Sequence, residues 1–352
     1  MLREIKLATL RLLKSGGIFQ LVANSRWRQQ RLLILCYHGI SLDDEHLWRP
    51  GLYMEPSILE QRLEILKRGN YAVLPLGESL ERLRAGTLPP RSVVITFDDG
   101  TFDFYKQAFP LLKRYGFPVT VYQTTYYTDF ERPVFNVIAS YMLWKRRGES
   151  VADGKEIGLP GPMDLRTEAA RHKIVMGLLS RANQEGMSGE QKDELCAGLA
   201  KLLGIDYEAL VATRMLQLMN AREVREVASS GVDIQLHTHR HRTPQNEARF
   251  RREIQDNRAR ILALASKSPS HFCYPSGVYR RMYFPWLEQE QVVSATTCDS
   301  GLVTRDSEML LIPRFVDTQK KTAIDFESWL SGVGDLLAVR RTASQIYVPV
   351  ET

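Results

Sequence analysis

Short apolar runs alternate with amphipathic helical patterns along most of this 352-residue chain. Apolar runs of this length bounded by turn residues are typical of buried strands, and their alternation with helices is typical of a parallel α/β sheet. The runs that predict strands are 32–37, 71–74, 92–97, 118–123, 232–236, 271–274, 292–296 and 310–315. The patterns that predict helices between and after them are 55–69, 103–115, 247–265 and 323–330. We therefore expect an α/β fold with parallel strands.

A long stretch in the middle of the chain has helical periodicity and almost no strand signal. It covers about residues 133–220, and its expected helices are 141–147, 167–182, 190–203 and 207–219. Because strand-like runs resume after it, we interpret it as a helical insertion into one α/β domain. The expected organisation is an N-terminal segment at 1–31 followed by one domain at 32–352. The insertion could cap a site, bind a partner or build an oligomer.

The N-terminal segment mixes apolar residues with many basic ones. Its basic residues are Arg3, Lys6, Arg11, Lys14, Arg26, Arg28 and Arg31. A basic amphipathic helix can lie on an anionic membrane surface, or it can pack on the outside of a domain. The segment lacks the apolar core of a signal peptide, and no run approaches the roughly 20 apolar residues of a membrane span. We expect a cytoplasmic protein, with peripheral membrane association as an open alternative.

Charge and cysteine content exclude some classes of function. The formal charge of +6 is modest for this length and no block of like charge dominates, so we expect no nucleic-acid partner. The four cysteines form no CxxC pair, which argues against a zinc ribbon or a thioredoxin-type site. Most of them lie in or beside apolar segments, where free cysteine usually behaves as a small buried hydrophobe.

Two adjacent aspartates follow the strand-like run 92–97, within the sequence Thr96-Phe97-Asp98-Asp99-Gly100. Like charges at close range resist joint ionisation, so such a pair is costly to hold together. A bound cation removes the conflict by taking one carboxylate as a ligand. The other carboxylate then stays available as a base.

Two histidines supply further candidate ligands. His237 and His241 are four residues apart, directly after the strand-like run 232–236, and a helix or tight turn brings both rings to one side. The carboxyl ends of parallel strands meet at one edge, where ligand sites form. Two imidazoles and one carboxylate leave open positions on a divalent ion, which can activate a water and polarise a carbonyl.

These motifs together resemble the polysaccharide deacetylase family, the NodB-homology carbohydrate esterases. The resemblance covers about 32–130 and 220–315 and leaves the helical insertion outside. It implies a deformed (β/α) barrel of about seven strands and metal-dependent hydrolysis of an N-acetyl group on a sugar. It also implies that Asp98 is the general base and that Asp99, His237 and His241 bind the metal. Zinc is the default ion for this ligand set, and other first-row divalent metals also fit.

The third motif of the family departs from its usual form here. The matching stretch, residues 272–277, has Cys273 at or near the place where the family usually has an arginine. The Pro-x-Gly turn remains, and the backbone N–H of Ser276 could donate to an oxyanion beside the metal. The missing arginine would normally orient Asp98, and Arg314 is a candidate substitute.

The catalytic acid also departs from the common pattern. Family members often carry this histidine near the C-terminus, but no histidine follows His271 in this chain. Some members that act on poly-N-acetylglucosamine carry it instead in a Tyr-His motif on an N-terminal strand, and this chain has Tyr37-His38 there. We expect His38 to be the general acid; the alternative is a buried structural histidine.

The resemblance leaves the substrate and the activity itself open. The leading interpretation is deacetylation of an N-acetylated amino sugar in a polysaccharide or glycan. The alternatives are a deacylase of a lipid-linked or nucleotide-linked sugar and a sugar-binding pseudoenzyme without turnover. The polymer, the choice between acetyl and formyl, and the oligomeric state are not predicted.

Overall fold

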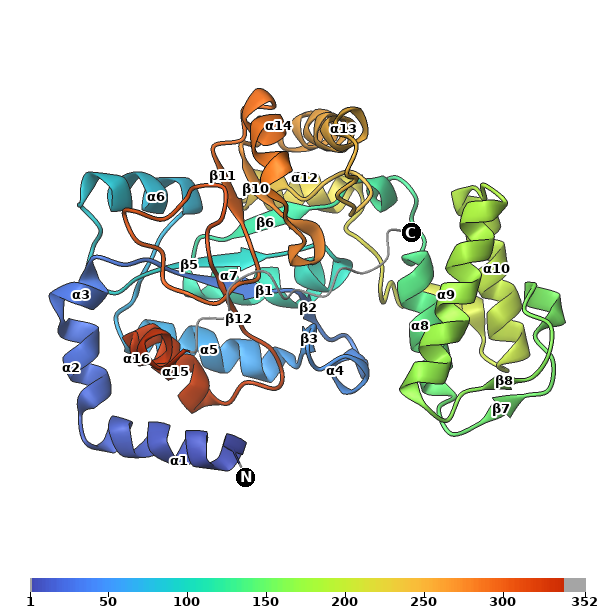
Figure 1. Cartoon of the computed structure of the whole chain (residues 1–352), viewed down its shortest axis with the longest axis horizontal. Coiled ribbons are helices and arrows are strands. Elements are labelled where there is room, and N and C mark those ends of the chain that lie inside the picture. Colours follow the sequence, from blue (N-terminus) through green and yellow to red (C-terminus); the bar gives the residue numbers. More distant parts are fainter. Residues whose placement is uncertain (1, 339–352) are drawn as a thin grey trace. The chain divides into compact units, whose positions relative to one another are not determined.

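The structure, a computed structural model, describes residues 2–338, so Met1 and the last part of the predicted 32–352 domain lie outside it. The described chain forms two compact units. The main unit comprises residues 2–100, 104–126 and 221–338, and the helical unit comprises residues 101–103 and 127–220. Figure 1 shows the parallel strands gathered in the main unit and helices α8 to α11 in the helical unit.

One parallel sheet forms the centre of the main unit. Its strand order is β11-β10-β9-β6-β5-β1-β12, and β4 also pairs with β5. The strands are β1 (Leu33–Tyr37), β4 (Ala72–Val73), β5 (Ser92–Phe97), β6 (Thr120–Gln123), β9 (Asp233–Leu236), β10 (His271–Cys273), β11 (Ser294–Thr296) and β12 (Phe315–Val316). Every residue of β1 and β5 is buried, which is expected where helices cover one face and the other lines the core.

The two edges of this sheet approach each other. Thr296 at the end of β11 forms a parallel bridge with Ile312, and Phe315 a few residues later pairs with Leu35 of β1. Residues 312–316 therefore join the last strand of the sheet to the first. The result is a closed but irregular ring, the deformed barrel that the sequence motifs imply. The predicted strand 310–315 is shorter than expected, since regular pairing is confined to β12.

Helices surround the barrel, and their sequences show why they begin and end where they do. In α5, Pro56 occupies the first turn, Leu59, Leu63 and Leu66 are buried, and Gly69 ends the helix. The other helices of the main unit are α1 (Leu2–Ser15), α2 (Ile18–Asn24), α3 (Arg26–Gln29), α4 (Glu45–Trp48), α6 (Leu76–Ala85), α7 (Phe109–Tyr115), α12 (Ala221–Ser229), α13 (Glu247–Ala265), α14 (Phe284–Gln289), α15 (Ala323–Ser331) and α16 (Val333–Leu337). A small parallel pair, β2 (Gly39–Ile40) and β3 (Tyr53–Met54), lies beyond β1.

The helices expected in the main unit need correction in two respects. The expected single helix 103–115 is a π-helical turn at Phe104–Ala108 followed by α7, because Pro110 has no N–H to continue a regular ladder. Helices α4, α6, α12, α14 and α16 were not predicted. The buried positions of α6, at Leu76, Leu80 and Leu83, nevertheless have helical spacing.

The helical unit contains a helix at each of the four expected places, although the first begins at Phe135 and not at Tyr141. These helices are α8 (Phe135–Lys145), α9 (Glu168–Gln184), α10 (Gly189–Leu202) and α11 (Tyr207–Ala212). A short antiparallel pair, β7 (Ser150–Val151) and β8 (Met163–Asp164), lies between α8 and α9. The expected helix 207–219 ends early, because Arg214 and Leu216 adopt positive φ angles of 61° and 59°, which are incompatible with a right-handed helix.

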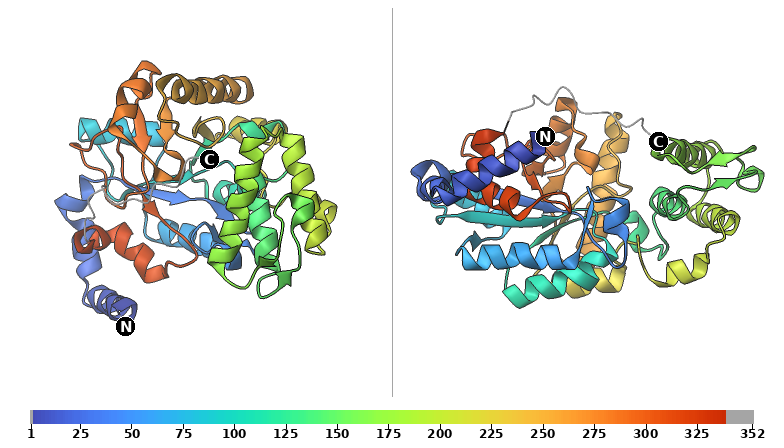
Figure 2. Two further views of the ribbon diagram at one scale, coloured as in Figure 1. Left: turned by 45° about the vertical axis from the view of Figure 1, so that its right-hand side comes forward. Right: turned by 90° about the horizontal axis from the view of Figure 1, so that it is seen from below.

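The N-terminal helices pack on the outside of the main unit (Figure 2), as one of the two sequence interpretations proposed. Leu7 and Leu10 of α1 are buried. Lys6 Nζ lies 2.9 Å from Asp325 and Lys14 Nζ 2.6 Å from Glu327, both on α15. No helix within residues 2–338 has the length and apolar character needed to cross a membrane.

Candidate active site

The two aspartates are presented by the turn that ends β5. The Asp98 N–H donates to the carbonyl of Tyr37 on the neighbouring β1, which holds the first aspartate in line with the strand. Asp99 and Gly100 then adopt positive φ angles of 70° and 76°. A Cβ at position 100 would overlap the Gln123 side chain, so the turn requires glycine twice over, for space and for backbone conformation. This turn directs the two carboxylates to different partners.

Asp99 meets the two histidines of the HxxxH motif. Its Oδ1 lies 3.2 Å from Nε2 of His237 and 3.2 Å from Nε2 of His241. The motif is an irregular turn after β9, not a helix, and Thr238 and His241 have positive φ angles. Burial alone would raise the pKa of Asp99, but the two neighbouring imidazoles hold it well below its ordinary value.

The orientation of His237 suits a metal ligand. Its Nδ1 lies 2.9 Å from the carbonyl oxygen of Cys273, which can only accept, so Nδ1 carries the proton and Nε2 presents a lone pair. Its backbone N–H donates to Asn257, whose own amide donates to the Gln123 carbonyl and to Thr125. The ring is therefore fixed from both sides.

The spacing of the three groups fits one small cation. Zinc–nitrogen and zinc–oxygen bonds of about 2.0–2.1 Å at a tetrahedral angle place donor atoms about 3.3 Å apart. The 3.2 Å separations from Asp99 to His237 and to His241 match that geometry, and all three donor atoms lie within 4.8 Å of one another. Two other groups of ligand-type residues share Asp98, one with Cys36 and His38 and one with His237 and Cys273. These two groups suit a cation less well, because both carboxylate oxygens of Asp98 already accept hydrogen bonds from an arginine.

That arginine is Arg314, which is fully buried. Its Nη1 and Nη2 lie 2.7 Å from Oδ1 and Oδ2 of Asp98, a two-point contact of the kind that guanidinium and carboxylate form best. Its Nε donates to the Thr297 carbonyl and Nη1 also to Thr96 Oγ1. Burial alone would raise the pKa of Asp98, but the Arg314 charge outweighs it and holds that pKa well below its ordinary value. Asp98 is thus ionised.

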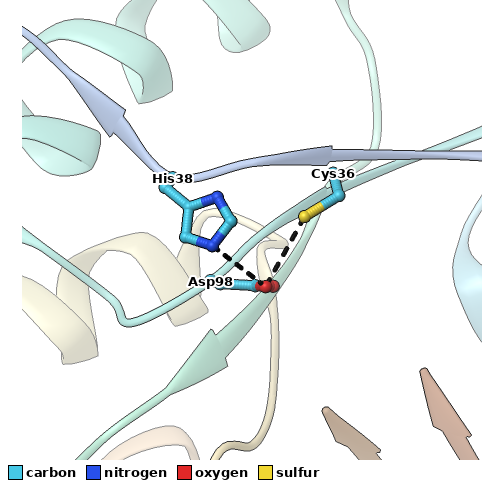
Figure 3. Close-up of side chains that lie close together, drawn as sticks. All are labelled: Cys36, His38 and Asp98. Atoms are coloured by element: carbon cyan, nitrogen blue, oxygen red, sulfur yellow. Dashed lines mark hydrogen bonds and ion pairs between the residues drawn. The ribbon is translucent and has the colours of Figure 1, made fainter. Parts of the chain in front are cut away.

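His38 and two cysteines approach the same carboxylate. Nε2 of His38 lies 3.6 Å from Asp98 Oδ2, and the Sγ atoms of Cys36 and Cys273 both lie 3.5 Å from that oxygen. Figure 3 shows Cys36 and His38 reaching Asp98 from one strand, as residues two apart on β1 and its extension should. The sequence predicts buried hydrophobes at these cysteines and does not predict this contact. The shared strand face of Cys36 and His38 was the available signal.

Three further residues lie in or shortly after strands β9 and β10: Ser276, His239 and His271. Ser276 sits in the short turn directly after β10, with a positive φ of 55°. His239, between the two candidate ligands, bonds Thr125 through Nδ1 at 2.9 Å and so turns away from Asp99. His271 bonds Ser294 on the neighbouring strand at 2.8 Å.

A family model described as polysaccharide deacetylase matches residues 85–161 and 207–291. These ranges contain both aspartates and both histidines that lie together in the structure. Over these two ranges, which make up less than half of the chain, the sequence is similar to polysaccharide deacetylases. The match extends into the helical insertion, up to residue 161 and again from 207, so the expectation that the insertion falls wholly outside the family resemblance was wrong. His38 and Arg314 lie beyond the matched ranges.

Individual deacetylases give the same picture. The poly-β-1,6-N-acetyl-D-glucosamine N-deacetylase of Escherichia coli (strain K12) is 28% identical over 99 residues, which are 28% of this chain and 14% of that protein. The chain therefore corresponds to a small part of this relative's length.

Solved structures of deacetylases share the fold. Streptococcus pyogenes deacetylase PplD in complex with acetate superposes with a TM-score of 0.54 at 18% identity, covering 82% of this chain and 93% of that one. IcaB from Ammonifex degensii superposes with a TM-score of 0.52 at 16% identity, covering 86% and 97%. These likenesses confirm the deformed (β/α) barrel of the NodB type.

Proposed function

We propose that this chain is a metal-dependent hydrolase that removes N-acetyl groups from an N-acetylated amino sugar in a polysaccharide or glycan. One observation carries the proposal. The Asp99, His237 and His241 donor atoms converge at metal-ligand spacing, directly beside Asp98, which is ionised and held by a buried arginine. A metal-ligand set next to an independent carboxylate base is the equipment that amide hydrolysis requires.

Asp99, His237 and His241 would hold the metal. Zinc is the first choice for two imidazoles and a carboxylate, and other first-row divalent ions remain candidates. When bound, such an ion polarises the acetyl carbonyl and makes a coordinated water more acidic. The proton on Nδ1 of His237, donated to the Cys273 carbonyl, keeps Nε2 free for ligation.

Asp98 accepts the proton of the attacking water. Arg314 keeps this carboxylate ionised and fixes its plane, in the place of the arginine that the third motif lacks. The backbone N–H of Ser276 is proposed as a donor to the oxyanion.

His38 is proposed to protonate the departing amine. Its Nδ1 is buried and has no hydrogen-bond partner within the described chain. A purely structural histidine would satisfy both ring nitrogens, so this orphaned atom favours the acid over the structural alternative.

The substrate is proposed to contain N-acetylglucosamine. This rests on the match to a deacetylase of poly-β-1,6-N-acetyl-D-glucosamine and on the Tyr-His pair at residues 37–38. The test is amine release from a panel of N-acetylated sugars, from monomer to oligomers and peptidoglycan fragments, with defined metals added to metal-free protein. We expect turnover of an N-acetylglucosamine oligomer that depends on added metal. Stoichiometric metal binding without amine release from any member would establish a sugar-binding pseudoenzyme instead.

A second proposal concerns location: the domain works at the cytoplasmic face of an anionic membrane, on a lipid-linked or membrane-attached glycan. The outward face of the N-terminal helices supports it. Four large apolar side chains are exposed there: Ile5 (55%), Leu12 (72%), Ile18 (37%) and Leu21 (68%). Arg26, at the start of α3, is exposed and could meet anionic headgroups, whereas Lys6 and Lys14 are paired with α15.

Vesicle flotation tests this surface. Deleting residues 1–31 would also expose core, because Leu10 is buried, so the sharper variant is the exposed pair Leu12→Glu and Leu21→Glu. We expect the wild type to float with phosphatidylglycerol-containing vesicles, and the variant to stay unbound while retaining activity on a soluble oligomer. Equal flotation of both proteins would contradict the proposal. So would a wild-type dimer that this variant dissociates, since a second copy would then cover the face.

A further inference from the structure

The Asp98 carboxylate is held unevenly. Oδ1 accepts a hydrogen bond from Arg314 Nη1. Oδ2 accepts one from Arg314 Nη2 at 2.7 Å and also lies 3.5 Å from each of two thiol sulfurs and 3.6 Å from Nε2 of His38. The sulfurs belong to Cys36 and Cys273, and neither residue has any exposed surface. Two thiol sulfurs therefore lie within hydrogen-bonding distance of the same carboxylate oxygen.

The two thiols come from different sides of the barrel. Cys36 is on β1, the strand next to β5, and pairs in register with Thr96. Cys273 is on β10, which the strand order separates from β5 by β9 and β6, so its side chain reaches across the interior. The Asp98 carboxylate contacts thiols from two strands and the Arg314 guanidinium. Rotation about its Cβ–Cγ bond would break contacts on both sides.

The protonation state of the thiols makes them donors. A thiol is ordinarily protonated at neutral pH, and these two are fully buried. A neutral S–H is a weak donor, and an ionised carboxylate is the strongest acceptor within its reach. Cys273 also accepts from Arg314 Nη2, 3.1 Å away, so it links the guanidinium to the carboxylate.

We propose that Cys36 and Cys273 are positioning residues, whose S–H groups donate to Asp98 Oδ2 and hold the carboxylate in the orientation needed to accept a proton. This inference rests on the proposed deacetylase function. Cys273 then explains how the third motif operates without its usual arginine. Arg314 supplies the charge from the position just before β12, and the Cys273 thiol contacts both the guanidinium and the carboxylate.

Serine and valine replacements distinguish a thiol that donates a hydrogen bond from one that only fills space. Serine keeps a donor in a similar shape, whereas valine fills the space without one. We expect Cys36→Ser and Cys273→Ser to keep kcat within about threefold. Cys36→Val and Cys273→Val should each lower kcat about tenfold, with KM and metal content unchanged, since one lost hydrogen bond to a charged group costs on the order of a factor of ten. Cys196→Val is the matched control, because Cys196 is equally buried but lies on α10 of the helical unit.

The outcomes that overturn the inference are distinct from failure of the proposed function. Valine variants with wild-type kcat, or serine and valine variants equally impaired, would show that the thiols only fill space. Infrared S–H stretching bands give a readout independent of turnover: two bands lowered by bonding to a carboxylate should move back in Asp98→Asn, while the Cys196 band stays. Absence of that shift overturns the inference even if the enzyme is active. Its presence in a protein without turnover would uphold the contacts and refute the function.

Discussion

Asp99→Ala and His237→Ala variants will each lose bound metal and about a thousandfold or more in deacetylation rate. The reason is that Asp99, His237 and His241 are the converging donors of one site, and each removal leaves two ligands for the ion. Loss of the metal removes several kcal/mol of transition-state charge stabilisation. Metal content by elemental analysis and amine release from an N-acetylglucosamine oligomer measure the two effects.

A histidine in the same turn provides the matched control. His239 lies between the two candidate ligands in sequence but bonds Thr125, so His239→Ala should keep stoichiometric metal. Chelation of the wild type should abolish activity, and added metal should restore it. Full metal occupancy in His237→Ala, or metal loss in His239→Ala equal to that in His237→Ala, would contradict the ligand assignment.

The second large effect is expected for Arg314→Leu. Removing one partner of a buried ion pair leaves an uncompensated charge, which costs about 3–5 kcal/mol of unfolding free energy. The Asp98 carboxylate would also lose its orienting contact, and misplacement of a catalytic group by about 1 Å costs on the order of 100-fold in rate. Chemical denaturation and steady-state kinetics, at equal metal occupancy, measure the two losses separately.

Two further variants test the physical cause. Arg314→Lys keeps the charge but not the two-point contact, so its stability and rate should fall between those of wild type and Arg314→Leu. The double variant Asp98→Leu with Arg314→Leu removes both charges and should recover most of the stability while remaining inactive. If the double variant were no more stable than Arg314→Leu, the loss would come from packing and not from the unpaired carboxylate.

Local sequence was enough to place the groups at the strand ends. Asp98 and Asp99 follow β5 and His237 follows β9, and parallel strands bring such residues to one edge whatever the details of the loops. The same reasoning fails where long-range contacts decide. Helix α11 ends at Ala212, and Arg214 just beyond it places its guanidinium over the ring of Phe102, a residue far away in the sequence that no local pattern links to this turn.

The cysteines show a different limit. A thiol in an apolar run has the same sequence signature whether it fills space or donates to a carboxylate, so Cys36 and Cys273 could not be distinguished from ordinary core residues. Arg314 was identifiable only as a candidate, since its contact with Asp98 joins positions 216 residues apart. The contacts that orient Asp98 are therefore between residues far apart in the sequence. The residues that indicate the chemistry, by contrast, belong to short sequence motifs.

The closure of the barrel separates the candidate metal ligands from the arginine that holds Asp98 in the order in which the chain is synthesised. The three candidate metal ligands all lie within the first 241 residues, whereas Arg314 belongs to the segment that joins β11 to β1. Cys36 and His38 lie at the other side of that seam, on and after the first strand. The proton-handling groups therefore assemble only when the first and last strands meet. A chain that ended before residue 314 would keep Asp99, His237 and His241 but would lack the buried guanidinium that holds Asp98.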